Sequence, residues 1–352
     1  MQIFNQIGFD NLRGDLFGGL TAAIVSLPLA LAFGVASGAG PAAGLYGAVL
    51  VGLFAALFGG TPTLISEPTG PMTVVMASVI TTMIAADPEN GLVMAFYVVI
   101  LAGIFQILFG LLKLGKYITL MPYSVISGFM SGIGVLLIIM QIPPFLGLDA
   151  PDGGVIGVLA SVPDLLKEAK PAEYGLGLLA FALLWALPAK WRKRCPPQLL
   201  ALVVATGASM LFLDGDAVRR IGAIPTGLPD LYFPTFTATH FTRIITDALV
   251  LGVLGSIDTL LTAMIADSLT REYHDSDREL VGQGIGNMLS GLCGGLPGAG
   301  ATMGTVVNIQ TGATSILAAV IRAVILLAIL LGAAPLTAPI PMAVLAAIAL
   351  KV

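Results

Sequence analysis

The sequence predicts an all-α protein that crosses a lipid bilayer many times. Of its 352 residues, 57% are hydrophobic and only 10% are charged, whereas a soluble domain carries roughly 25% charged residues. Several apolar runs approach or exceed the ~20 residues that a helix needs to span a bilayer. Two of these runs are interrupted by similar stretches rich in glycine and proline, which indicates a fold made of two related halves.

The apolar runs predict twelve membrane segments. Their expected spans are 15–36, 43–59, 70–86, 91–112, 121–141, 174–189, 197–213, 246–266, 279–294, 301–310, 313–334 and 338–352. The first run follows a mixed polar stretch without a basic region, so we interpret it as a retained helix and not as a signal peptide. Between the fifth and sixth segments we expect a polar loop, whose acidic residues are Asp149, Asp152, Asp164 and Glu168.

The distribution of basic residues predicts which side of the membrane each loop faces. Most basic residues follow even-numbered segments: Lys113, Lys116, Lys190, Arg192, Lys193, Arg194, Arg271, Arg278 and Lys351. Because basic loops stay in the cytoplasm, we expect a multi-pass protein of the cell inner (plasma) membrane with a cytoplasmic N-terminus. The exceptions are Lys167, Lys170, Arg219, Arg220 and Arg243.

The two interrupted stretches share the same outline. Each opens with Gly-x-Pro and closes with Thr-Val-Val, over residues 60–75 and 295–307. They would start the third and tenth segments as half-helices in mid-membrane, with unpaired N–H groups that attract an anion. Thr69 and Thr302 lie at these starts. Matched interruptions of this kind are typical of a transporter binding site.

The spacing of the stretches also predicts the domain organisation. The first half would run over about residues 11–245 and the second over about 246–352. The second half is shorter than the first. We therefore expect residues 1–352 to be one transmembrane domain that lacks two further helices and a soluble tail.

Asp258 is the most informative charged residue, because a carboxylate in mid-segment is costly and usually functional. Thr262 follows one helical turn later, so both side chains lie on one helix face. Their oxygens suit a small alkali cation or a proton. The alternatives are an ion pair with Arg322 in the eleventh segment and a carboxylate solvated in a cavity. Glu67, beside the first half-helix, has no assigned role at this point.

Other motifs predict packing and not chemistry. Gly282-x-Gly284-x-Gly286 and Gly128-x-x-x-Gly132 are expected to let helices approach closely. The two cysteines, Cys195 and Cys293, cannot form a disulfide framework. We find no G-x-S-x-G, H-E-x-x-H or P-loop motif, so we expect no enzyme, and nothing indicates a nucleic-acid partner.

Together these motifs resemble the sulfate-permease, or SLC26, family of anion transporters. The resemblance rests on residues 13–23, 41–47, 59–71, 114–117, 121–128, 222–229 and 282–287. It implies a UraA/SLC26-like fold of seven plus seven helices in inverted repeats, with a core domain and a gate domain. It also implies that the C-terminal STAS domain is absent here, as are the last two helices. The full-length protein would then form a homodimer through that missing domain.

The resemblance also implies roles for particular residues. Thr69 and Ala301 would contact bicarbonate, and Asp258, Thr262, Gly300 and Thr302 would bind sodium. Sodium is then the coupling ion, without an organic cofactor, in a sodium-dependent bicarbonate symporter for low-affinity inorganic carbon uptake.

One position departs from many relatives of this family. They carry an arginine where this chain has Gly304, so a bound sodium ion would replace the missing positive charge. The alternatives are a transporter of sulfate or another oxyanion with proton or sodium coupling and, from another class, an anion channel.

Overall fold

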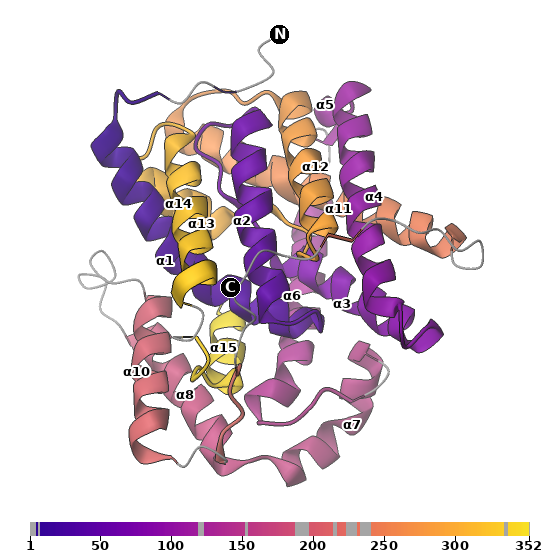
Figure 1. Ribbon diagram of the computed structural model, residues 1–352, viewed down its shortest axis with the longest axis vertical. Coiled ribbons are helices and arrows are strands. Elements are labelled where there is room, and N and C mark those ends of the chain that lie inside the picture. The colour runs from indigo at the N-terminus through magenta and orange to yellow at the C-terminus, as the bar shows by residue number, and fades with distance from the viewer. Residues whose placement is uncertain are drawn as a thin grey trace.

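The computed structural model describes residues 5, 8–118, 123–151, 154–186, 197–213, 217–222, 231–232, 241–333 and 337–351. This part is largely helical (Figure 1). In chain order its elements are α1 (Leu12–Ser37), α2 (Pro41–Phe58), β1 (Ser66–Glu67), α3 (Gly70–Ala86), α4 (Gly91–Leu111), α5 (Gly115–Ile118), α6 (Tyr123–Phe145), α7 (Gly154–Glu168), α8 (Pro171–Ala186), α10 (Pro197–Phe212), α11 (Phe241–Thr270), α12 (Ser276–Leu292), β2 (Ala299–Gly300), α13 (Thr302–Gln310), α14 (Leu317–Ala328), a π-helical turn (Ile329–Ala333) and α15 (Met342–Ala349).

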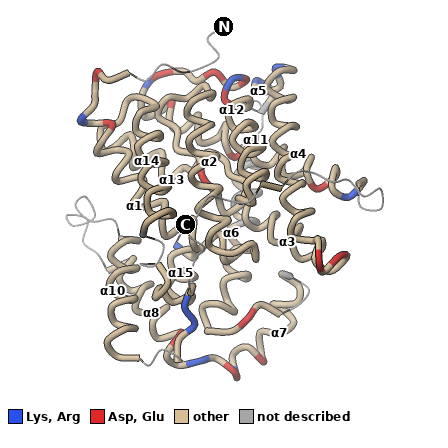
Figure 2. The backbone as a smooth tube through the Cα atoms, in the orientation of Figure 1, with Lys and Arg blue, Asp and Glu red and all other residues tan. Residues whose placement is uncertain are grey.

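Each of the twelve predicted segments overlaps a helix, but α14 begins only at Leu317 and α15 only at Met342, so the last two segments start later than predicted. Four of the described helices, α1, α2, α4 and α11, are long and apolar enough to cross a membrane alone. Most of the length of the long helices is free of charged residues, many of which lie in the connections at the top of the view and around α7 (Figure 2). This distribution is the one expected of helices whose central parts face lipid.

The predicted loop between the fifth and sixth segments is wrong in part, because it contains the helix α7. This helix is amphipathic: Val158 and Leu165, seven residues apart, are both buried, whereas Asp164 is exposed. It packs against α6 and α3. A helix of this kind is too polar to predict as a membrane segment, yet its apolar stripe suffices to hold it on the bundle.

Helices of the two halves pack in an equivalent way. In the first half α4 lies against α11 and α12, and in the second half α14 lies against α1 and α2. Each fourth helix therefore packs on the first two helices of the other half. This matching arrangement agrees with the two related halves predicted from the sequence.

The two interrupted stretches meet at the centre of the bundle. β1 and β2 pair in antiparallel fashion, with Ser66 opposite Gly300 and Glu67 opposite Ala299. The helices that follow, α3 and α13, consequently leave this crossover in opposite directions (Figure 1). The strands approach closely because residue 298 is glycine: a Cβ there would lie 2.7 Å from the carbonyl oxygen of Glu67.

A second group of helices, α6, α8, α10 and α15, lies beside this assembly with α7 (Figure 1). Within it, α8 packs on α10 and α15, and α6 packs on α7 and α15. Its contacts with the first group run mainly from α1 to α15 and from α3 to α6. The crossover therefore lies in the first group, close to its boundary with the second.

Candidate functional site

The start of α3 forms one wall of the candidate site. Thr69 is the N-cap residue, with extended backbone, but its hydroxyl does not cap the helix. Instead, Thr69 Oγ1 donates a hydrogen bond of 2.7 Å to Asp258 Oδ2. The first turn of α3 begins with Gly70 and Pro71, which line the cavity, and the N–H groups of Gly70 and Met72 have no intrahelical partners because they lie in the first turn.

The start of α13, in the second half of the fold, lies opposite the start of α3. Its N-cap residue, Ala301, donates its own N–H to the carbonyl oxygen of Ile65 at 2.8 Å. The unpaired N–H groups at this end are consequently those of the first helical turn, which begins at Thr302. Two helix N-termini thus meet at the crossover, and each carries a partial positive charge.

The predicted sodium ligands lie together. Thr262 Oγ1 donates to the carbonyl oxygen of Gly300 at 2.8 Å and lies 3.0 Å from Thr302 Oγ1. Asp258 lies one turn earlier on α11 and is 4% exposed. All four residues offer oxygen atoms, the ligands that hard cations prefer. The donor set therefore fits a small alkali cation.

These groups line a cavity of about 540 Å³. Its walls include Thr69, Asp258, Gly300, Ala301 and Thr302. Leu29 and Phe33 of α1 and Leu137 of α6 supply apolar surface. A few polar groups among apolar walls suit a small hydrophilic solute. The structure thus brings five of the six predicted site residues to one cavity, with Thr262 directly behind them.

Arg322 does not pair with Asp258, so the predicted alternative of an Asp258–Arg322 ion pair is wrong. Its Nη1 lies 2.7 Å from Glu67 Oε2, and both side chains are buried. Among the residues that the structure describes, Asp258 has no basic partner and accepts one hydrogen bond, from Thr69. The role of Glu67, left open by the sequence, is to pair with this buried guanidinium.

Sequence reasoning missed the buried amides that hold the crossover in place. The Asn287 side chain bonds both the N–H and the carbonyl of Gly298, at 2.7 and 2.9 Å. It also donates to Gln106 Oε1 at 2.7 Å, while Gln283 Oε1 accepts from Ser66 Oγ at 2.9 Å. The available signal was the presence of three amide side chains inside apolar segments, where each needs a partner.

The two glycine motifs behave differently. In α12, Gly282, Gly284 and Gly286 lie directly against the backbone of Gly59, Gly103 and Val51, which confirms the predicted close packing. In α6, a Cβ on Gly128 or Gly132 would meet no described atom within 4 Å. No described residue packs against the second motif, so its packing role stays a prediction.

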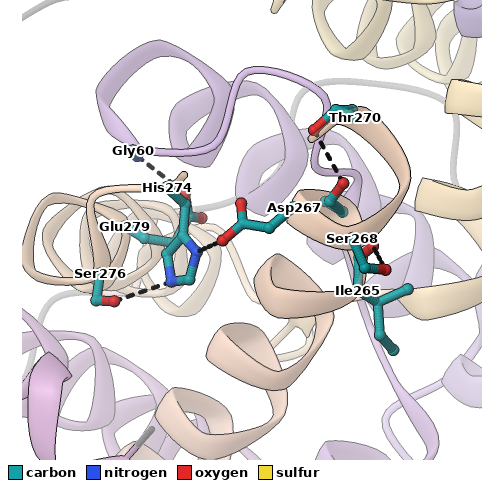
Figure 3. Close-up of polar contacts among 9 residues, drawn as sticks. Gly60, Ile265, Asp267, Ser268, Thr270, His274, Ser276 and Glu279 are labelled. Atoms are coloured by element: carbon teal, nitrogen blue, oxygen red, sulfur yellow. Dashed lines mark hydrogen bonds and ion pairs between the residues drawn. The ribbon is translucent and has the colours of Figure 1, made fainter. Parts of the chain in front are cut away.

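A second group of polar contacts lies at the turn between α11 and α12 (Figure 3). His274 Nδ1 lies 2.7 Å from Asp267 Oδ2, and its Nε2 lies 2.9 Å from Ser276 Oγ. Glu279 accepts a hydrogen bond of 2.9 Å from the N–H of Gly60. These contacts tie the turn to the linker between α2 and β1, so they help to fix the crossover.

Several predictions concern residues outside the described part of the chain. They are Cys195, the basic cluster at 190–194, and most of the stretch at 222–229 on which the family resemblance partly rests. Cys293 is a half-buried free thiol.

The fold and the site together define a polytopic membrane protein with a cavity between the starts of two helices, one from each half. The chain matches the sulfate permease family over residues 12–352 and belongs to it. The predicted family and fold are thereby confirmed.

Two relatives are bicarbonate transporters named BicA. The one from Picosynechococcus sp. is 61% identical over 356 residues, covering 100% of this chain and 63% of the relative. The one from Synechocystis sp. is 62% identical over 352 residues, covering 100% of this chain and 62% of the relative. A putative sulfate transporter of Bacillus subtilis, YvdB, is 35% identical over 360 residues. These relatives are transporters and not enzymes.

Two solved structures have the same fold as this chain. The transmembrane domain of a cyanobacterial BicA is 62% identical, covers 99% of this chain and 89% of that structure, and superimposes with a TM-score of 0.96. Murine Slc26a9 shares the fold, with a TM-score of 0.86 at 20% identity, covering 99% of this chain and 61% of that structure. The chain spans just over three-fifths of the two BicA relatives, at 63% and 62% of their lengths.

Proposed function

We propose that this chain is the transport domain of a sodium-coupled bicarbonate symporter that works by alternating access. The observation that carries the proposal is the position of Asp258. Its carboxylate lines the cavity between two helix N-termini and has no basic partner among the described residues. A transporter of anions with an unpaired carboxylate in its binding cavity needs a cation for each cycle.

The need for a cation follows from electrostatics. Two like charges about 4 Å apart repel by about 4 kcal/mol at an effective dielectric constant of about 20. The partial positive charges of the two helix N-termini offset only part of this repulsion between Asp258 and a bound anion. A sodium ion bound at Asp258, Thr262, Gly300 and Thr302 would cancel the carboxylate charge. Bicarbonate could then accept hydrogen bonds from the N–H groups that begin α3 and α13.

Bicarbonate as substrate is supported by the two BicA relatives, which match the whole chain. Thr69 and Ala301 line the cavity at the two helix starts, where such an anion would lie. Sulfate is the second candidate, because YvdB, a putative sulfate transporter, matches 99% of the chain. In that case Asp258 would carry a proton or sodium in the same position.

Labelled-bicarbonate uptake into proteoliposomes tests the proposal. We expect uptake that requires sodium, fails when potassium replaces it, and resists competition by sulfate. Asp258→Asn should abolish the sodium dependence. The matched control is Asp247→Asn on the same helix, whose carboxylate lies 3.6 Å from Arg243. Uptake that ignores sodium contradicts the coupling, and sulfate uptake above bicarbonate uptake contradicts the substrate.

The orientation we propose is a cytoplasmic N-terminus in the cell inner membrane. Basic residues support it: Arg278 donates a hydrogen bond of 2.6 Å to Asn5, just before α1. Gly115, which lies between Lys113 and Lys116, donates its N–H to the neighbouring Asp277 at 3.0 Å. Labelling of a cysteine introduced at exposed Tyr273 by an impermeant reagent tests it. Labelling only after permeabilisation is expected. For a full-length protein we propose a homodimer formed through a following soluble domain, which cross-linking tests.

A further inference from the structure

The Arg322–Glu67 ion pair lies directly behind the candidate site. Arg322 is 0% exposed although it lies inside α14, a membrane segment. Its Nη1 also bonds Ser26 Oγ at 2.9 Å, and its Nη2 bonds the carbonyl oxygens of Ala48 and Ser66, each at 2.7 Å. These bonds fix the guanidinium against α1, α2 and β1, so its positive charge has a permanent place beside the crossover.

Glu67 connects this charge to the cavity. Glu67 lines the cavity together with Asp258. One carboxylate oxygen, Oε2, is held by Arg322. The other, Oε1, lies next to the first turn of α13, since a Cβ on Gly304 would be 3.3 Å from it. The carboxylate thus stands between the guanidinium and the anion-attracting end of α13, and it masks the arginine charge from a bound anion.

The fixed charges around the cavity therefore sum to minus one. Asp258 and Glu67 each contribute a negative charge, and Arg322 contributes one positive charge. A bound sodium ion brings the sum to zero, and bicarbonate then leaves a single negative charge opposite two helix N-termini. Sulfate would leave two. Each further uncompensated charge in a buried site is strongly unfavourable.

We infer that Glu67 is a specificity-determining residue, which masks the charge of Arg322 and thereby limits the site to a monovalent anion that needs a cation. This inference rests on the proposed function. Without the Glu67 carboxylate, the guanidinium would itself supply a positive charge to the cavity. The site would then accept a divalent anion more readily and depend less on sodium.

A purely structural role for the pair makes a different prediction. If Glu67 and Arg322 only brace β1 against α14, their removal lowers the amount of folded protein and all uptake together. The ratio between two substrates would not change. The ratio of sulfate to bicarbonate uptake, measured per folded protein, therefore separates the two roles.

The experiment compares Glu67→Gln with the double variant Glu67→Gln/Arg322→Gln in proteoliposomes. The amide keeps an acceptor for Arg322 while removing the charge. We expect the uptake ratio of sulfate to bicarbonate to rise about tenfold or more in the single variant, since a tenfold change requires only about 1.4 kcal/mol. Bicarbonate uptake without sodium should rise as well. The double variant restores the charge sum, so both values should return toward those of the unmodified protein.

The inference is overturned if folded Glu67→Gln keeps the original ratio, or if the double variant keeps the raised one. Should Glu67→Gln not accumulate, Arg322→Gln replaces it, and its extra negative charge must lower the ratio. Failure of both single variants to fold would assign the pair to folding alone and overturn the inference. Sodium-independent uptake by the unmodified protein would instead contradict the proposed coupling, while the ratio would still report on Glu67.

Discussion

The Thr262 hydroxyl offers a sharp test of the cation site. In Thr262→Val the side chain keeps its shape, but the hydrogen bond to the Gly300 carbonyl and the contact with Thr302 Oγ1 are lost. One proposed ligand disappears, and a buried carbonyl loses its partner. Losses of this kind amount to about 1 to 3 kcal/mol, which corresponds to roughly 5- to 150-fold in affinity.

The assay is a sodium titration of labelled-bicarbonate uptake. We expect the half-saturating sodium concentration to rise within that range, while maximal uptake at saturating sodium stays within about threefold because the anion contacts are intact. The matched control is Thr246→Val, on the same helix, whose exposed hydroxyl bonds only the carbonyl of Thr242. An unchanged sodium titration for Thr262→Val would refute the assignment of this hydroxyl to the cation site.

Three further predictions concern the crossover and its supports, and thermal unfolding in detergent measures each of them. Asn287→Ala removes both bonds to Gly298 and should destabilise the fold by about 2 to 4 kcal/mol, because the buried peptide groups lose their partners. Gly298→Ala places a methyl group 2.7 Å from the Glu67 carbonyl and should cost about 1 to 3 kcal/mol by overpacking. Asp15→Ala removes the carboxylate that binds the N–H groups of Thr314 and Ser315 before α14, and should cost about 1 kcal/mol. An unchanged midpoint would contradict any of the three, and Asp10→Ala, at an exposed position, is the control.

The half-helices could be predicted from the sequence because their signals are local. Gly-x-Pro interrupts an apolar run in each half, and the likeness of the two stretches predicted a binding site built from both. Asp258 and Thr262 could be placed on one helix face by their spacing alone. Gly300 and Thr302 then followed from the family resemblance, and the structure brings all four to one place.

The parts that could not be predicted depend on contacts between distant segments. Arg322 and Glu67 lie 255 residues apart. No periodicity in the sequence indicates that Arg322 pairs with Glu67 and not with Asp258. The motif at Gly128 shows that a local pattern alone does not identify a packing partner. A small-residue pattern permits close packing, but a neighbouring helix must be present, and none of the described residues fills that position.

The central claim is that sodium at Asp258 makes the cavity able to hold the anion. Thermodynamic linkage requires that each ligand then strengthens the binding of the other by the same factor. The most direct measurement is a sodium-binding isotherm of the purified protein with and without bicarbonate. We predict that bicarbonate tightens sodium binding by about tenfold or more, within the usual range of coupling energies, and that Asp258→Asn removes this effect. Identical isotherms with and without bicarbonate would contradict the account.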